Sequence, residues 1–584
     1  MREMRKGKHE FGRALALTAW LAAGALAVAE QVQHLSITQP GGMPGWPVMT
    51  GIQRTNDITK LTWDGPSGYY QLYYKTNLAS ATWLKFGSPN LNRTTNVISL
   101  HSNIFFRVSG PAPQYTGAQT CLECHPTVHS SETLTPHARA FIDPEFVALG
   151  GQTNSSCLPC HTVGYGLPSG FKSSTDFRST NRLAGVQCEN CHGPAANHAA
   201  NEMDLTARPR VDIAAQVCGG CHSGEMKPTF EEWDASAHAI VTEDMNPVSR
   251  INSCGRCHSG TARLAMVNGL SATTIANTLT NDANVPITCV VCHDPHALHS
   301  WTNVMSGVII TNQLRYPTAS TNYFSLSTSA TFSNRYDINV CAQCHNDRGA
   351  AVGTTSRAPH HSPQYNLLMG TVGVLPGAGT NYINCATNAQ PGAHAGFPSS
   401  AKYSLSGTFY LTNQCVSCHM QPNPAPDLTH SHRFELDTYT TCLQCHPATP
   451  DQLVPLVMFP AVSNRVYALK RELDTWASTI APPALRSNGV LAWEYTTPGG
   501  LDWKTNAFGV RTGWYINDQV RFIGPPAGTN NPPSGQYLVV APIQQARFNL
   551  YLVLNDGSWG AHNPQFALKL LDNAYYWVVQ ELFQ

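Results

Sequence analysis

Cysteine and histidine recur in one fixed arrangement along this chain. Of its 19 cysteines, 18 fall into nine copies of a five-residue motif, Cys-x-x-Cys-His. The two residues between the cysteines follow no rule, so the two thiols and the imidazole must carry the chemistry. In chain order the motif cysteines are Cys121, Cys124, Cys157, Cys160, Cys188, Cys191, Cys218, Cys221, Cys254, Cys257, Cys289, Cys292, Cys341, Cys344, Cys415, Cys418, Cys442 and Cys445. The histidines that close the motifs are His125, His161, His192, His222, His258, His293, His345, His419 and His446.

The spacing within the motif suits covalent attachment of haem. Residues three and four positions apart on a helical turn project from one face. Two thiols at this spacing can bond the vinyl groups of one porphyrin while the next histidine ligates its iron. Zinc half-sites and redox-active disulfides also use Cys-x-x-Cys pairs, but neither needs a histidine directly after every pair. The motifs therefore predict nine haems c per chain.

The second axial ligand of each iron must come from elsewhere in the chain. Histidines outside the motifs are the candidates, and one close behind a motif is expected to serve a neighbouring haem, because it cannot easily reach the far face of its own. Eleven candidates for nine positions neither require nor exclude an open, substrate-binding haem. They are His129, His137, His198, His238, His296, His299, His360, His361, His394, His430 and His432.

Two further residues of these types lie outside this scheme. His562 precedes Asn563-Pro564, where a helix is expected to begin, and a capping or packing role is favoured over ligation. Cys385 is the one cysteine outside the motifs, and we expect a buried thiol.

The amino terminus predicts export. Basic residues from Arg2 to Arg13 precede an apolar stretch, Ala14 to Val28, and Ala27-Val28-Ala29 has the small-x-small pattern of a signal peptidase site. We expect a signal peptide over residues 1–29, the general secretory route, and a periplasmic or extracellular location. No later run of 18 apolar residues occurs, so no integral membrane segment is expected after cleavage. Lys plus Arg and Asp plus Glu are both 36, which gives no basic field for nucleic acid.

Three regions must position these motifs. Residues 31–113 show short alternating apolar segments at 61–63, 69–74, 82–86, 97–100 and 104–108, which predict a small all-β sandwich resembling immunoglobulin or fibronectin type III domains. An irregular arm on the haem region is the alternative. Residues 114–446 form the predicted nonahaem domain, mainly helix and loop.

The motifs are dense in this central region. It offers roughly 36 residues of chain per haem, too few to bury nine porphyrins separately, so the haems are expected to lie against one another and conduct electrons. Longer gaps precede Cys341 and Cys415, and the first, 302–339, has the composition of loops or edge strands.

The carboxy-terminal region, 447–584, contains no motif. Helical periodicity appears over Asn464–Trp476, Pro542–Leu554 and Pro564–Leu582. We expect these helices to lie on the haem core or to pair protomers in a homo-oligomer.

Several segments resemble one superfamily. They are similar to the multihaem superfamily of ammonia-forming cytochrome c nitrite reductase, hydroxylamine oxidoreductase and octahaem tetrathionate reductase. The segments are residues 188–198, Cys292-His-Asp-Pro-His296, Cys418-His-Met with His430-Ser-His-Arg-Phe434, and Gly560-Ala-His-Asn-Pro564. The resemblance implies possible catalysis on a small nitrogen or sulfur compound. The nitrite reductases, however, carry a Cys-x-x-Cys-Lys motif at the catalytic haem, and none occurs here. No catalytic residue can be carried over.

Two functions of different class follow. The first is an exported electron-transfer protein whose partners are redox proteins, such as a quinol oxidase or other cytochromes. The second is a terminal oxidoreductase with one five-coordinate haem that acts on nitrite, hydroxylamine or tetrathionate.

Overall fold

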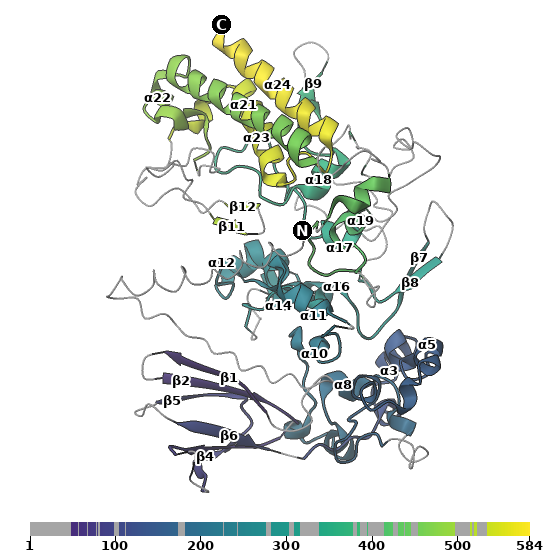
Figure 1. Cartoon of the computed structure of the whole chain (residues 1–584). Helices are drawn as coiled ribbons and strands as arrows, with labels where there is room; N and C mark the ends of the chain where they lie inside the picture. Colours follow the sequence, from purple (N-terminus) through teal and green to yellow (C-terminus); the bar gives the residue numbers. More distant parts are fainter. Residues whose placement is uncertain are drawn as a thin grey trace, which may run out of the picture. The chain divides into compact units, whose positions relative to one another are not determined.

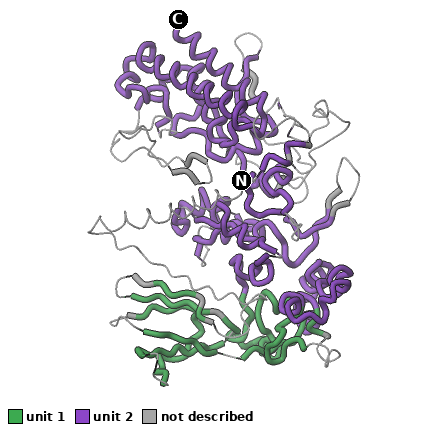
Figure 2. The backbone as a smooth tube through the Cα atoms, viewed as in Figure 1, with its two compact units in different colours: residues 1–117, 162–184, 188–210 green, residues 118–161, 185–187, 211–584 purple. Residues whose placement is uncertain are grey.

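The computed structural model describes two compact units (Figures 1 and 2). The described residues are 48–584 without 99–103, 173–180, 276–281, 303–308, 316–337, 378–381, 386–389, 395–413, 424–429, 445–453, 497–513, 522–533 and gaps of one to three residues. The first unit comprises residues up to 117 with 162–184 and 188–210, and the second comprises 118–161, 185–187 and 211–584. The predicted signal peptide lies outside the described residues.

Six strands at the start of the first unit form two three-stranded antiparallel sheets, ordered β1-β2-β5 and β4-β3-β6. Leu61 and Trp63 from β2 meet Tyr70 and Leu72 from β3 in one buried cluster, so the two sheets share an apolar core. The strands are β1 (Val48–Thr55), β2 (Ile58–Asp64), β3 (Tyr70–Lys75), β4 (Leu84–Asn90), β5 (Thr94–Ile98) and β6 (Phe105–Ser109).

The predicted apolar segments fall on or overlap β2 to β6, so among these six strands β1 alone was not predicted. The alternation in β1 is weak, and its pairing with β2 shifts register between Met49 and Gly51. A Cβ on Gly51 would lie 2.5 Å from Oγ1 of Thr62, so glycine permits the close approach at this irregularity. The pairing of β1 thus depends on a contact with β2 rather than on its own pattern.

Short helices carry the motifs. The rest of the first unit contains η2 (Asn181–Leu183), α8 (Cys188–His192), α9 (Ala196–Ala200) and η3 (Leu205–Ala207). In the second unit, up to the eighth motif, the helices are α2 (Ala118–Cys121), α3 (Pro126–Glu132), α4 (Pro136–Arg139), α5 (Pro144–Ala148), η1 (Gly151–Thr153), α6 (Leu158–His161), α10 (Gln216–Gly219), α11 (Thr229–Asp234), η4 (Ala237–Ala239), α12 (Val248–Arg250), η5 (Ile251–Gly255), α13 (Arg256–His258), α14 (Gly260–Val267), α16 (Cys289–Cys292), α17 (Ile338–Ala342), α18 (Gln364–Met369) and α19 (Gln414–His419).

Small antiparallel hairpins lie between these helices. β7 (His299–Thr302) pairs with β8 (Ile309–Asn312), in the gap where loops or edge strands were expected, and β9 (Val374–Pro376) pairs with β10 (Tyr382–Asn384). Further along, β11 (Trp514–Ile516) pairs with β12 (Gln519–Arg521). The remaining elements are η8 (Tyr439–Gln444), η9 (Val454–Met458), α22 (Pro483–Arg486), η10 (Gly489–Trp493) and η11 (Gln536–Leu538).

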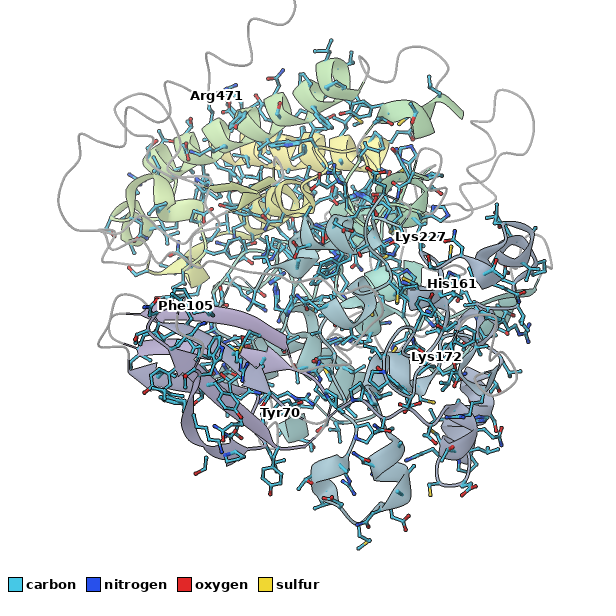
Figure 3. The ribbon with its side chains drawn as sticks, turned by 60° about the horizontal axis from the view of Figure 1, so that its bottom comes forward. Tyr70, Phe105, His161, Lys172, Lys227 and Arg471 are labelled. Carbon is cyan, nitrogen blue, oxygen red and sulfur yellow. The ribbon has the colours of Figure 1, made fainter. Side chains whose placement is uncertain are left out.

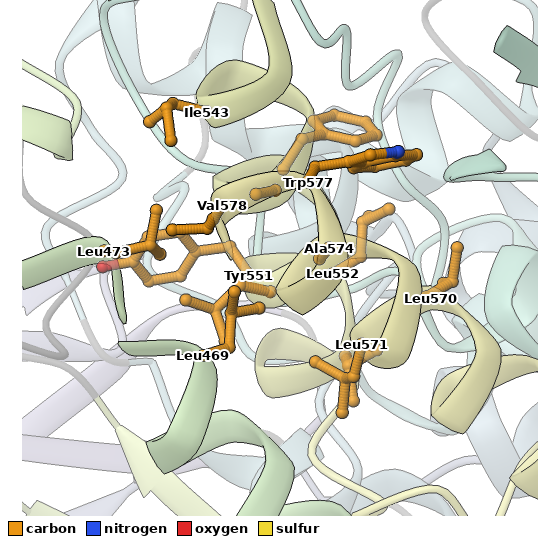
Figure 4. Packing of buried hydrophobic residues seen from close by; sticks show 14 of the residues in the cluster. Leu469, Leu473, Ile543, Tyr551, Leu552, Leu570, Leu571, Ala574, Trp577 and Val578 are labelled. Atoms are coloured by element: carbon orange, nitrogen blue, oxygen red, sulfur yellow. The ribbon is translucent and has the colours of Figure 1, made fainter. Parts of the chain in front are cut away.

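Three long helices form the largest apolar core, in the carboxy-terminal part of the second unit. They are α21 (Phe459–Thr479), α23 (Ala541–Asp556) and α24 (Pro564–Leu582), which confirm the three predicted helices. Figure 4 shows Leu469, Tyr551 and Leu571, one from each helix, in this core. On α24 the side chains of Phe566, Leu570, Ala574 and Trp577 recur at helical spacing and are buried.

This core also includes residues that precede the eighth motif. Leu367, Val374 and Cys385 lie in the same buried cluster as the three helices, so the core crosses the predicted boundary at 446/447. Cys385 is 0% exposed, which confirms the expected buried thiol. Among the described residues, no helix is both long enough and apolar enough to cross a membrane.

Candidate haem sites

Each described motif forms a helical turn. The backbone N–H of the motif histidine donates to the carbonyl of the first cysteine in several copies, at 2.8 Å for His125 and Cys121 and 2.9 Å for His345 and Cys341. The third, fifth and eighth motifs lie in or at the end of α8, α13 and α19. The expected arrangement of two thiols and one imidazole on one turn is therefore present. In the ninth motif, Cys445 and His446 lie outside the described residues.

Five motif histidines face another histidine ring. The ring centroids lie 6.1 to 6.4 Å apart in every case, and each pair joins a motif histidine to a histidine from a distant part of the second unit. The pairs are His222 with His137, His345 with His238, His258 with His360 or His361, His293 with His432, and His419 with His562.

This separation is the one that a shared iron requires. Metal–imidazole bonds are about 2.0 Å long, and the ring centre lies about 1.1 Å behind the bonding nitrogen, so two axial imidazoles have centroids roughly 6.3 Å apart. Stacked imidazoles lie closer together, as for His360 and His361, whose centroids are 4.0 Å apart, whereas edge-on aromatic pairs such as Trp63 and Tyr70 reach 6.3 Å without a metal. The five pairs thus fit a haem iron between their rings.

Several of these imidazoles are held in the tautomer that ligates iron. Nδ1 of His419 lies 3.1 Å from the carbonyl of Phe434, and Nδ1 of His432 lies 2.9 Å from the carbonyl of His430. A carbonyl only accepts, so Nδ1 carries the proton and Nε2 keeps a lone pair. Nδ1 of His161, a motif histidine labelled in Figure 3, lies 2.8 Å from the carbonyl of Ala140. These hydrogen bonds orient the rings and leave Nε2 as the ligand atom.

Burial also keeps two of the rings neutral. It lowers the pKa of His238 to about 4, and the neighbouring charge of His345 adds to the effect. Burial likewise lowers the pKa of His419 to about 4. The neutral imidazole is the form that binds a metal, so the environment favours ligation near neutral pH.

His562, for which the sequence favoured a capping or packing role, lies opposite a motif histidine. It does lie just before a helix, but Asn563 provides the N-cap of α24 by accepting from the backbone N–H of Phe566. The imidazole of His562 instead faces His419 with 6.1 Å between ring centroids. No local pattern marks it, because its partner belongs to the eighth motif, far away in the sequence.

The other predicted distal candidates lie elsewhere. His129 is on α3 and His198 on α9, where Nδ1 of His198 is buried without a hydrogen-bond partner among the described residues. Nε2 of His299 lies 3.2 Å from Oδ2 of Asp294. Nδ1 of His394 lies 2.7 Å from the carbonyl of Ala561, and Nδ1 of His430 lies 2.8 Å from that of Met420. The backbone N–H of His296 donates to Asp294.

Thiols from different motifs also lie together. Cys160 of the second motif is hydrogen-bonded to Cys221 of the fourth, and Cys218 of the fourth to Cys289 of the sixth. Burial, and then the nearby thiols of Cys341 and Cys344, raise the pKa of Cys292 to about 12. The attachment points of motifs that do not follow one another in the sequence, such as the second and the fourth, are therefore neighbours.

Two further pairs of motifs also lie close together. Cys257 of the fifth motif is hydrogen-bonded to Cys344 of the seventh. Burial, and then the thiol of Cys442, raise the pKa of Cys418 to about 11, so the eighth and ninth motifs are close as well.

Comparisons with known proteins agree with this chemistry. The family described as "Cytochrome c554 and c-prime" matches residues 120–193, which include the first three motifs. The chain is 26% identical to the C-type polyheme cytochrome OmcC of Geobacter sulfurreducens over 328 residues, 50% of this chain and 38% of that protein. It is 28% identical to the multiheme cytochrome MtrA of Shewanella baltica over 160 residues, 24% of this chain and 45% of that protein.

One solved structure is also similar. The outer cell wall cytochrome OcwA is matched over 80% of this chain and 99% of its own, with 17% identity and a TM-score of 0.43. The chain spans less than half the length of OmcC and MtrA. Motifs and relatives together support one class of protein, the multihaem c-type cytochromes with covalently bound haem. Its relatives in that class include OmcC and MtrA.

Proposed function

We propose that this chain is an exported nonahaem cytochrome that transfers electrons along a row of closely spaced haems. The observation that carries the proposal is the contact between attachment points of different motifs. Each motif thiol would bond the edge of one porphyrin. Thiols that touch across two motifs, as Cys257 and Cys344 do, would bring two porphyrin edges together. Electron tunnelling falls off steeply with the distance between such edges, so these contacts favour fast transfer.

The hydrogen-bonded and neighbouring thiols suggest an order within the second unit. The second motif neighbours the fourth, the fourth neighbours the sixth, and the sixth neighbours the seventh, which also touches the fifth. The eighth and ninth motifs form a further neighbouring pair. We propose that electrons follow this spatial order, which differs from the order of the motifs in the sequence.

The opposing rings supply the proposed axial ligands. We assign His137 to the haem of the fourth motif, His238 to the seventh, His432 to the sixth and His562 to the eighth. Six-coordinate irons cannot bind a substrate without losing a ligand, and they change little on reduction, as suits an electron carrier. This favours electron transfer over the terminal oxidoreductase considered from the sequence.

The fifth motif offers two distal candidates, since the ligand atoms of His258, His360 and His361 all lie within 4.8 Å of one another. The Ser362 hydroxyl donates its proton to the carbonyl of Asn346 at 2.7 Å. It must therefore accept a hydrogen bond from Nδ1 of His360, which lies 2.8 Å away. His360 therefore carries its proton on Nδ1 and has a lone pair on Nε2. We assign His360 as the ligand.

The amino-terminal strands support a separate proposal. Their two sheets, β1-β2-β5 and β4-β3-β6, and their shared core are compatible with a fibronectin type III-like sandwich. We propose that it docks the cytochrome to a redox partner protein or a cell surface outside the cytoplasmic membrane. Deleting residues 31–113 should abolish that association and leave the haem spectrum unchanged.

One measurement tests the main proposal. The purified protein should contain nine haems by pyridine haemochrome assay, and its ferric electron paramagnetic resonance (EPR) spectrum should contain only low-spin signals. A high-spin signal that changes on adding nitrite, hydroxylamine or tetrathionate would instead establish the terminal oxidoreductase.

A further inference from the structure

The turn between α23 and α24 contains a buried carboxylate in contact with His562. Oδ1 of Asp556 lies 2.6 Å from Nδ1 of His562, and the Asp556 side chain is 0% exposed. The same His562 ring faces His419 of the eighth motif. Asp556 therefore contacts the imidazole that faces His419, and the spacing of the two imidazoles suits a haem iron between them.

The turn holds Asp556 and His562 firmly. α23 ends at Asp556, and Gly557 continues with a φ of 75°, a left-handed conformation that closes the helix. The Ser558 hydroxyl donates to Oδ2 of Asp556, and the Ser558 backbone N–H donates to the same oxygen at 3.3 Å. The backbone N–H of His562 donates to the Ser558 hydroxyl at 3.3 Å.

The rest of the turn has little freedom. Gly560 has a φ of 93°, and a Cβ there would lie 2.8 Å from Cγ2 of Val462 on α21. Asn563 then caps α24. The carboxylate and the imidazole are thus fixed by two buried helices rather than by a free loop.

We propose that Asp556 is a positioning residue that sets the donor strength of His562 and so lowers the reduction potential of the haem of the eighth motif. This inference rests on the axial assignment of His562 made above. A carboxylate that accepts the Nδ1 proton fixes the tautomer with Nε2 free and makes the imidazole a stronger electron donor. A stronger donor stabilises ferric more than ferrous iron.

Among the axial imidazoles assigned above, His562 is the one with a carboxylate partner in the described contacts. Nδ1 of His432 lies against a carbonyl and Nδ1 of His360 against a hydroxyl, and both are weaker acceptors than an ionised carboxylate. The haem of the eighth motif should therefore have a lower potential than the haems closed by His360 and His432. Electrons would leave it readily for its neighbours.

The test uses the haem-loaded full chain. Asp556→Asn keeps the shape of the side chain but replaces the charged acceptor with a neutral one. We expect one low-spin EPR species to change its g values, with the total low-spin intensity and the haem content unchanged. In a spectroelectrochemical titration the midpoint potential of one component should rise by about 59 mV. For a one-electron couple this corresponds to a tenfold change in the equilibrium constant.

A second variant should lower the midpoint potential of the same haem. Ser558→Ala removes a hydrogen-bond donor from the Asp556 carboxylate, which then accepts more strongly from His562, so the potential should fall. Asp572→Asn on α24 is the matched control, because Asp572 is 57% exposed and pairs with Arg465. It should leave the spectrum and the titration unchanged.

His562→Ala distinguishes the axial role of His562 from the positioning role of Asp556. If His562 is the ligand, this variant produces one high-spin haem per chain. An Asp556→Asn protein identical to Asp572→Asn in both measurements would overturn the role of Asp556 alone. A His562→Ala protein that stays entirely low-spin would overturn the axial assignment and this inference with it, while electron transfer itself would stand. If Asp556→Asn fails to fold, the direction of the shift in Ser558→Ala decides.

Discussion

The imidazole rings of His419 and His562 face each other with 6.1 Å between their centroids. His419 closes the eighth motif on α19, whereas His562 lies in the turn before the last helix. Four other motif histidines face a distant histidine at nearly the same separation. A repeated spacing of this size is compatible with a haem iron between the two rings of each pair.

Removal of one proposed distal ligand should open one haem. His432→Ala should leave the iron held by His293 five-coordinate or water-bound, because the opposing ring is lost. Titration of the reduced protein with carbon monoxide should then detect one more binding site per chain than in the wild type. His299→Ala is the matched control, since Nε2 of His299 is engaged by Asp294. Equal carbon monoxide binding by the two variants would contradict the assignment.

The two neighbouring histidines of the fifth motif should differ in effect. His361→Ala should keep every haem low-spin, because His360 carries the hydrogen bond to Ser362 that orients it. His360→Ala should convert one haem to high spin, or shift one set of g values if His361 replaces it. EPR of both ferric variants measures this. High-spin iron in His361→Ala but not in His360→Ala would reverse the assignment.

The thiol count gives an independent check on nine haems. If 18 cysteines form thioethers, Cys385 is the one free thiol in the chain. Burial raises its pKa to about 11 and it is 0% exposed, so it should resist alkylation in the native protein. Iodoacetamide labelling followed by mass spectrometry should add one label after denaturation and none before. Three labels after denaturation would mean that one motif carries no haem.

Stability should depend on pH through Glu132 on α3. This side chain is 6% exposed, and burial raises its pKa from 4.5 to about 7. The native protein therefore holds a proton that the unfolded chain releases, so stability is fully present below pH 4.5 and is lost as the pH rises towards 7. The loss amounts to roughly 3 kcal/mol at most.

A neutral side chain at this position should remove that loss. We expect Glu132→Gln to raise the midpoint of thermal unfolding relative to wild type at pH 8 but not at pH 4. Glu145→Gln, on the exposed surface of α5, should change the midpoint little at either pH. An unfolding midpoint that rises between pH 5 and pH 7 in the wild type but not in Glu132→Gln would refute this role of Glu132.

Prediction from sequence succeeded where the signal is local. The motif turns, the β2 to β6 segments and the three carboxy-terminal helices all depend on residues within a few positions of one another. β1 escaped prediction because its pairing needs Gly51 against Thr62. The likeness to nitrite reductases and hydroxylamine oxidoreductases remains a prediction, since the relatives OmcC and MtrA are named as polyheme and multiheme cytochromes.

The sequence by itself determined the haem attachment chemistry, because two thiols and an imidazole on one helical turn need nothing beyond five consecutive residues. It also supplied a surplus of histidines without indicating their partners. Only the tertiary structure decided which rings face each other, which motifs are neighbours, and that His562 stands beside Asp556 opposite His419. The reason is physical: an axial pair joins residues far apart in the chain, and their separation is fixed by how helices and turns pack, which no local pattern records.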